Sequence, residues 1–131
     1  MCKRLSLASP ETDRFIREAY KGPCSLCGAV KSKYHYDHLN MFYKTASILD
    51  LVEETIGRIA EEIAKCHIVC IPCHEKITAK EVSLGYMAKK KALNRAARAG
   101  EDITECRIAL ATAYAADFSA IYASMAAGGR T

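Results

Sequence analysis

Two Cys-x-x-Cys pairs constrain the fold of this chain more than any other feature of its sequence. Cys24 and Cys27 form the first pair, Cys70 and Cys73 form the second, and 42 residues separate them. Closely spaced cysteines in an intracellular protein are more often metal ligands than disulfides. Four thiolates in two such pairs suit a tetrahedral structural Zn²⁺. The sequence therefore predicts a zinc site that joins two distant parts of the chain.

Three further cysteines leave alternatives open. Cys66 and the neighbouring His67 lie near enough to the second pair to replace one of its ligands. Cys2 is interpreted as a free thiol near the terminus, and Cys106 as a thiol on a helix that is buried in the core. Because the total of seven is odd, complete intramolecular disulfide pairing is excluded.

Length and composition indicate one ordinary domain. The chain has 131 residues, half of them hydrophobic, so a modest core can form without obligatory crosslinks. The first twenty residues lack the apolar run of a signal peptide, and we find no continuous apolar span of 18 residues. We expect a soluble, cytoplasmic protein without a membrane segment.

The positive charge is concentrated in one segment. Residues 74–100 carry seven basic and two acidic side chains, a balance of +5, whereas the whole chain carries +4. A local basic stretch beside a metal motif favours a phosphate-bearing partner. The alternative interpretation is a solvated helix face.

Local patterns predict an α+β fold that is mostly helical. Ser9 caps a first helix with Pro10 at its first position, and apolar spacings of three and four indicate the later helices. The tyrosine-rich stretch before His38 and the CHIVC stretch are typical of short strands. The predicted elements are helices over 9–20, 45–65, 72–99 and 102–127 and strands over 33–38 and 66–70.

The last two helices carry one expectation each. At 100° per residue, Lys80, Lys91, Arg95 and Arg98 fall within a narrow arc, which predicts one basic face. The last helix has an apolar stripe, so it packs either on the core of its own chain or on a second subunit. Its stripe comprises Ile103, Leu110, Tyr114, Phe118, Ile121 and Met125.

A structural zinc leaves Asp37, His38 and His74 without a role. Asp37 and His38 are adjacent on the first predicted strand, and His74 directly follows the last cysteine of the second pair. A carboxylate and an imidazole that converge can hold a second metal with open positions, and the adjacent histidine then remains available as a base.

This pattern resembles the HNH endonuclease family, also called ββα-metal or His-Me finger nucleases. The residues that carry the resemblance are CSLC at 24–27, YDHL at 36–39 and EIAKCHIVCIPCHEKIT at 62–78. The resemblance covers roughly residues 20–80. It is strongest to the small subgroup with two Cys-x-x-Cys zinc knuckles, because these motifs occur together in this order and spacing.

The resemblance implies a metal-dependent endonuclease that hydrolyses DNA phosphodiester bonds, by nicking or by double-strand cleavage. Asp37 and His74 would bind the catalytic divalent metal, and His38 would be the general base that activates water. The four cysteines would bind the structural zinc. Two protein ligands leave positions for water and phosphate oxygens, as Mg²⁺ prefers, and Mn²⁺, Ni²⁺ or Zn²⁺ could substitute.

The resemblance also implies a domain plan and a set of DNA contacts. We expect an HNH nuclease domain over 1–100, with its core at about 20–80 and its basic helix to about 99, followed by an amphipathic helix over 101–131. The setting would be a bacterial cytoplasm or a phage-infected host cell. The predicted nucleic-acid contacts are Lys31, Lys33, Lys76, Lys80, Lys91, Arg95 and Arg98.

Four residues near these motifs are interpreted separately. Lys65 stands where many family members have an asparagine that orients the base, and Ile77 stands where many have a lysine. His35 shares a strand face with Asp37, so it either assists the metal or substrate or is a surface histidine. His67 is interpreted as structural.

Two readings without catalysis remain open. A zinc-containing DNA-binding module needs only the cysteine pairs and the basic helix, with Asp37, His38 and His74 incidental. An interaction protein, for example a component of a phage packaging machine or a homodimer, would use the C-terminal helix for contact.

Overall fold

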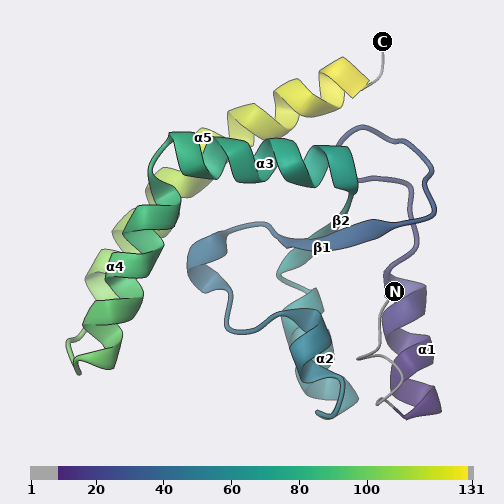
Figure 1. Cartoon of the computed structure of the whole chain (residues 1–131), viewed down its shortest axis with the longest axis horizontal. Coiled ribbons are helices and arrows are strands. Elements are labelled where there is room, and N and C mark those ends of the chain that lie inside the picture. The colour runs from purple at the N-terminus through teal and green to yellow at the C-terminus, as the bar shows by residue number, and fades with distance from the viewer. Residues whose placement is uncertain (1–8, 130–131) are drawn as a thin grey trace.

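A two-stranded antiparallel sheet lies at the centre of a mostly helical α+β fold (Figure 1). The computed structural model describes residues 9–129, so Cys2 lies outside the described residues. The elements in chain order are α1 (Pro10–Ala19), β1 (Tyr34–His38), the 3₁₀ turns η2 (Met41–Tyr43) and η3 (Ile48–Leu51), α2 (Ile56–Ile63), β2 (Cys66–Cys70), α3 (Ile71–Ser83), α4 (Tyr86–Arg98) and α5 (Thr104–Gly129).

Helices cover the sheet from two sides. Strand β1 pairs with β2 in a register that sets Asp37 opposite His67 and Tyr34 opposite Cys70. Figure 1 shows α3 and α5 on one side of the sheet and α1 and α2 on the other. Because successive side chains of a strand point to opposite faces, neighbouring residues of β1 face different helices.

Each side has its own hydrophobic cluster. The larger cluster joins the cysteine-rich loop, the sheet and helices α3, α4 and α5, with Tyr114 and Phe118 fully buried. The smaller one packs α1 and α2 under the sheet around Ile16 and Ile59. Helix α5 therefore packs on the core of its own chain, one of the two options that its apolar stripe left open.

Most predicted elements are confirmed. The side chain of Ser9 caps α1 by accepting a hydrogen bond from the backbone N–H of Thr12. Strands β1 and β2 lie within a residue of their predicted bounds. Gly100 follows α4 with a positive φ of 84°, a backbone conformation that glycine adopts without steric cost.

Two predicted helices are wrong in extent. The segment 45–65 forms η3 and α2, because the side chain of Thr55 caps a new helix by accepting from the N–H of Arg58. The segment 72–99 forms α3 and α4, because Gly85 takes a φ of 81° between them. Lys80 therefore lies on a different helix from Lys91, and the single basic face predicted across this segment is wrong.

One expectation about the last helix is also wrong, and a second property of this helix bears on the expected absence of a membrane segment. Among the described residues, α5 is long and apolar enough to span a membrane by length and composition alone, with a mean hydropathy of 1.2 in an 18-residue window within Thr104–Ala127. Its many alanines produce this value although charged residues interrupt any long apolar run. Cys106, predicted to be buried, is exposed and lines a surface groove together with Leu93, Ile103 and Leu110.

Two glycine substitutions test the break between α3 and α4. Gly85→Ala should lower the free energy of unfolding by about 1 kcal/mol, because alanine is strained at positive φ. Gly57→Ala in α2 should raise it by roughly 0.5 kcal/mol, because glycine weakens a helix and no atom lies within 4 Å of the added Cβ. Urea denaturation measures both. Equal effects of the two substitutions would contradict this assignment of Gly85.

Candidate functional site: a four-cysteine cluster beside an acidic and histidine-lined cleft

The four predicted zinc ligands converge. The Sγ atoms of Cys24, Cys27, Cys70 and Cys73 all lie within 4.8 Å of one another. The Sγ atoms of Cys27 and Cys70 are 3.7 Å apart. A tetrahedral Zn²⁺ with bonds of about 2.3 Å requires sulfur separations of about 3.8 Å, so the cluster fits this ion.

Backbone groups around the cluster favour a thiolate at Cys24, whereas burial raises the pKa of Cys70 and of Cys73. The N–H of Cys70 donates to Sγ of Cys24 at 3.3 Å, and the N–H of Ala29 donates to Sγ of Cys27 at 3.5 Å. Burial raises the pKa of Cys24, but hydrogen bonds from backbone N–H groups, those of Cys27 and Cys70 first, outweigh burial and lower the pKa to about 6. A thiolate is the form that binds metal.

The alternative ligands have other partners. The thiol of Cys66 lies 3.4 Å from the backbone oxygen of Glu62, and burial raises its pKa to about 12. Nε2 of His67 contacts the carboxylate of Asp37. Within residues 9–129, the cluster thus comprises the two Cys-x-x-Cys pairs without Cys66 or His67.

A cleft of about 580 Å³ runs along β1 between the loop after that strand and helices α3 and α4. Asp37, His38 and His74 all line it. Asp37 and His38 are neighbours in an extended strand, so they point to opposite faces of the sheet. The structure thus gives Asp37 partners on the α3 side and His38 a partner on the α2 side.

The partner of His38 is the buried carboxylate of Glu62. Nε2 of His38 lies 2.7 Å from Oε2 of Glu62, whose side chain has no exposed surface. Burial raises the pKa of Glu62, but hydrogen bonds, those from Thr45 and Lys65 first, hold this pKa well below its usual value. Glu62 is therefore an ionised acceptor, and Nε2 of His38 must carry the proton that it donates.

This pairing fixes the tautomer of His38. Burial is the largest influence on the pKa of His38 and lowers it, although Glu62 opposes that change. A neutral imidazole with its proton on Nε2 has a free lone pair on Nδ1. His38 thus has the protonation state that a general base requires at neutral pH.

Five donors besides His38 hold the Glu62 carboxylate in place, among them the N–H of Ala46 at 3.5 Å from Oε2. The hydroxyl of Thr45 donates to Oε1 at 2.6 Å, and the backbone N–H of Thr45 donates to Oε2 at 3.1 Å. Nζ of Lys65 lies 3.0 Å from Oε1, and Nη1 of Arg58 lies 3.3 Å from it. Lys65, which replaces an asparagine common in the resembled family, therefore supports the histidine through Glu62.

Asp37 lies between two histidines on the other face. Its Oδ2 is 2.6 Å from Nε2 of His67, its cross-strand partner, and its Oδ1 is 4.0 Å from Nε2 of His74. One cation with bonds of about 2.1 Å reaches two atoms separated by up to about 4.2 Å. The separation of Asp37 and His74 is thus within the span of one cation, and His67 contacts the other oxygen of the carboxylate.

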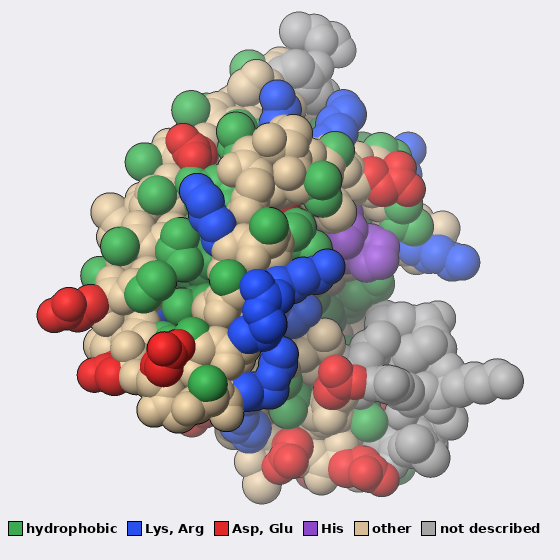
Figure 2. All heavy atoms as spheres, turned by 60° about the vertical axis from the view of Figure 1, so that its left-hand side comes forward, with side chains coloured by type: hydrophobic (Ala, Val, Ile, Leu, Met, Phe, Trp, Pro, Cys, Tyr) green, Lys and Arg blue, Asp and Glu red, His purple; other side chains and the backbone are tan. Residues whose placement is uncertain are grey.

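Lysines surround the cleft. Lys44, Lys90 and Lys91 line it. Burial is the largest influence that lowers the pKa of Lys90, and the nearby cations of Arg107 and Lys44 lower it further. Figure 2 shows Lys and Arg side chains gathered beside the exposed histidine surface. Such a convergence of cations favours a bound anion.

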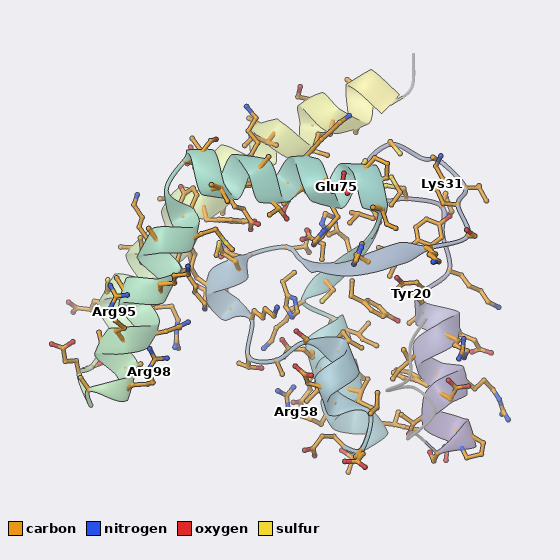
Figure 3. The ribbon with its side chains drawn as sticks, viewed as in Figure 1. Tyr20, Lys31, Arg58, Glu75, Arg95 and Arg98 are labelled. Carbon is orange, nitrogen blue, oxygen red and sulfur yellow. The ribbon has the colours of Figure 1, made fainter. Side chains whose placement is uncertain are left out.

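The other predicted DNA contacts are spread over the molecule. Arg95 and Arg98 lie on α4, whereas Lys31 lies on the cysteine-rich loop at the other end of the sheet (Figure 3). Lys33 lines a separate cavity near that loop. Lys76 and Lys80 border a groove between α3 and α5. Of the seven predicted contacts, Lys91 is the one that lines the cleft.

Helix α5 supports the site from behind. The ring of Tyr122 lies 5.1 Å from the ring of His67, measured between centroids. Nδ2 of Asn40, just after β1, donates to the backbone oxygen of Ala111 at 2.8 Å. The loop that follows His38 is thereby attached to α5.

Sequence reasoning missed Glu62, Lys44 and Lys90 as site residues. Glu62 lies inside the motif that carries the resemblance, so its position was a usable signal. No pattern marked Lys44, because it reaches the cleft from an irregular loop. Comparison of the chain with protein-family models, with curated proteins and with solved structures gave no match.

Replacing one cysteine of the cluster tests the zinc site. Cys73→Ser should remove bound zinc and destabilise the fold strongly, because the free energy of binding a structural zinc is also folding free energy. Elemental analysis and thermal unfolding measure both effects. Cys106→Ser, at an exposed thiol, is the matched control and should keep one zinc per chain. Full zinc content in Cys73→Ser would contradict the assignment.

Proposed function

We propose that the protein is a metal-dependent DNA endonuclease of the HNH type. The observation that carries this proposal is the buried His38–Glu62 pair, which opens into a cleft also lined by Asp37 and His74. A lone histidine beside a carboxylate can be structural. A neutral histidine with a fixed tautomer, next to two candidate metal ligands and several lysines, supports phosphodiester hydrolysis.

Each residue has a role that its environment supports. Nδ1 of His38 accepts a proton from the attacking water, and Glu62 stabilises the imidazolium that forms. Asp37 and His74 hold the divalent metal, which when bound neutralises charge on the phosphate and the leaving oxygen. Mg²⁺ suits a site whose open positions are filled by water and phosphate oxygens, and Mn²⁺, Ni²⁺ or Zn²⁺ are alternatives.

The lysines of the cleft provide the phosphate contacts in this proposal. Lys44, Lys90 and Lys91 would bind the DNA backbone on either side of the scissile phosphate, and the exposed Arg95 and Arg98 of α4 would extend this contact. Backbone contacts of this kind give binding that depends steeply on salt and weakly on base sequence. Lys76 and Lys80 remain predictions without a geometric link to the cleft.

The non-catalytic alternatives explain less of the structure. A zinc-containing DNA-binding module uses the cysteine cluster and the exposed cations. It gives no reason for a buried carboxylate that fixes the tautomer of a histidine lining a cleft. An interaction protein built on α5 gives none either.

Cleavage of supercoiled plasmid tests the proposal. The wild type should produce nicked or linear DNA only when a divalent metal is added, and His38→Ala should cut slower by a factor of about 10² to 10⁴. The variant should keep its zinc and its affinity for DNA. Asp37→Ala and His74→Ala should each raise the metal concentration needed for cleavage. Undiminished cutting by His38→Ala would exclude the mechanism.

Glu62→Gln separates positioning of the base from general stability. The amide keeps the shape of the side chain but stabilises an imidazolium less well, so kcat should fall by roughly tenfold or more while affinity for DNA is unchanged. Glu61→Gln, at the exposed neighbouring position, is the matched control and should leave kcat within about twofold of wild type. Equal kcat values for the two variants would show that Glu62 has no part in catalysis.

A further inference from the structure

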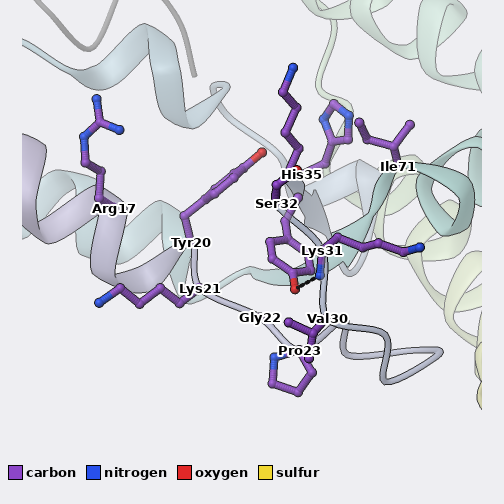
Figure 4. Close-up of a pocket in the computed structure, with 12 residues that line it drawn as sticks. Arg17, Tyr20, Lys21, Gly22, Pro23, Val30, Lys31, Ser32, His35 and Ile71 are labelled. Atoms are coloured by element: carbon purple, nitrogen blue, oxygen red, sulfur yellow. Dashed lines mark hydrogen bonds between the residues drawn. The ribbon is translucent and has the colours of Figure 1, made fainter.

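A second cavity lies at the opposite end of β1 from His38. It has a volume of about 730 Å³ and lies between the end of α1 and the cysteine-rich loop (Figure 4). Four basic side chains line it, and none of the described lining residues is acidic. Arg17 also pairs with Asp13 at 2.8 Å on the surface of α1. The basic residues are Arg17, Lys21, Lys31 and Lys33.

Aromatic and aliphatic surface is interleaved with this charge. The ring of Tyr20 lies among the lining residues, and its orientation is fixed by edge contacts with Tyr34 at 6.3 Å and Tyr36 at 5.1 Å, measured between ring centroids. Val30 lines the same cavity with 83% of its surface exposed, and Ile71 with 38%. Exposed apolar groups beside lysines match a ligand that has both a flat apolar face and negative charge.

The floor of the cavity is rigid. The hydroxyl of Tyr34 accepts a hydrogen bond from the N–H of Lys31 at 2.6 Å. A Cβ atom at Gly22 would lie 2.0 Å from the same hydroxyl, so only glycine allows the chain to pass this closely. The loop that carries Lys31 and Lys33 is thereby fixed against β1, and the cavity is preformed.

One histidine joins this cavity to the cleft. His35 lines the cavity, and its ring stacks on the ring of His74 with centroids 4.4 Å apart and planes inclined by 21°. Along β1, Tyr34 and Asp37 are three residues apart, which corresponds to about 10 Å. A stacked nucleic-acid strand covers this distance in about three nucleotides.

We propose that this cavity binds unpaired nucleotides of the DNA strand a few residues away from the scissile phosphate. This inference rests on the proposed nuclease function and names its substrate class, DNA with a single-stranded segment next to the cleavage site. The lysines would contact phosphates, and a base would stack against Tyr20. A concave site of this volume accommodates a nucleotide but not a double helix.

Fluorescence anisotropy with labelled oligonucleotides tests the proposal in the His38→Ala protein without added divalent metal, so that the probe is not cut during the measurement. The probes are oligothymidylate and oligouridylate of about 12 nucleotides and a blunt duplex of similar length. Lys31→Ala/Lys33→Ala should weaken binding of oligothymidylate by roughly tenfold and of the duplex by less than about threefold. Tyr20→Leu, checked for zinc content, should weaken the binding of oligothymidylate by roughly fivefold.

A matched pair controls for loss of charge. Arg14→Ala/Lys89→Ala removes two positive charges outside both the cavity and the cleft. It should change the affinity for each probe by less than about threefold. If this control weakens the binding of oligothymidylate as much as Lys31→Ala/Lys33→Ala does, the effect is one of general electrostatics and the proposal is wrong.

Other outcomes would also overturn it. One is that Lys31→Ala/Lys33→Ala lowers the affinity for the single strand and for the duplex equally, and another is that Tyr20→Leu has no effect on affinity. The remaining two are that the protein binds oligouridylate more than about tenfold more tightly than oligothymidylate, or that it binds no single strand at all. Plasmid cleavage by the wild type separates this failure from failure of the nuclease proposal. Cutting without single-strand binding leaves the nuclease and removes the cavity site.

Discussion

The convergence of four cysteines is the constraint on which the rest of the structure depends. Cys70 and Cys73 stand at the junction of β2 and α3, and Cys24 and Cys27 stand in the loop that leads to β1. A metal at these sulfurs would fix the first turn of α3 against the sheet. His74 is the next residue, so its place opposite Asp37 follows from the cluster. In the proposed mechanism the cysteine site does no chemistry itself, but it positions His74 for the open metal site.

Asp37 and His38 are adjacent in β1, and this adjacency places their side chains on opposite faces of the sheet. Because neighbouring residues of a strand point to opposite faces, one dipeptide supplies both layers of the molecule with a functional group. Asp37 meets histidines from β2 and α3, whereas His38 meets Glu62 from α2. The proposed metal ligand and the proposed base therefore have separate supports, and both border one cleft. A mutation in the Glu62 network should affect the base without disturbing the metal ligands.

Sequence reasoning predicted the elements whose signals are local. Ser9 with Pro10, the two strands and the apolar stripe of α5 were all readable, because capping and periodicity depend on neighbouring residues. The cysteine cluster was also predicted, because its spacing is specific. The break at Gly85 was missed, because a single glycine within a helical pattern is often tolerated and only its positive φ reveals the turn.

The rest depended on contacts between segments far apart in the chain. Glu62 is 24 residues from His38, so although it lies inside the motif that carries the resemblance, the sequence does not show that it is buried beneath that histidine. His67 was interpreted as structural, and its contact with Asp37 follows from the strand register, which the sequence alone does not specify. The cavity between α1 and the cysteine-rich loop combines Arg17 and Lys21 with Lys31 and Lys33, two pairs that no motif connects.

The central claim is that one closed metal site positions one open metal site. A crystal structure of the protein soaked in Mn²⁺ tests this claim most directly, with anomalous scattering recorded at the zinc and manganese edges. Two peaks are predicted. Zinc should lie among the four cysteine sulfurs, and manganese should lie within about 2.2 Å of both Asp37 and His74. Zinc at the cysteines with no manganese at Asp37 and His74 would contradict the claim and leave the cluster as a purely structural site.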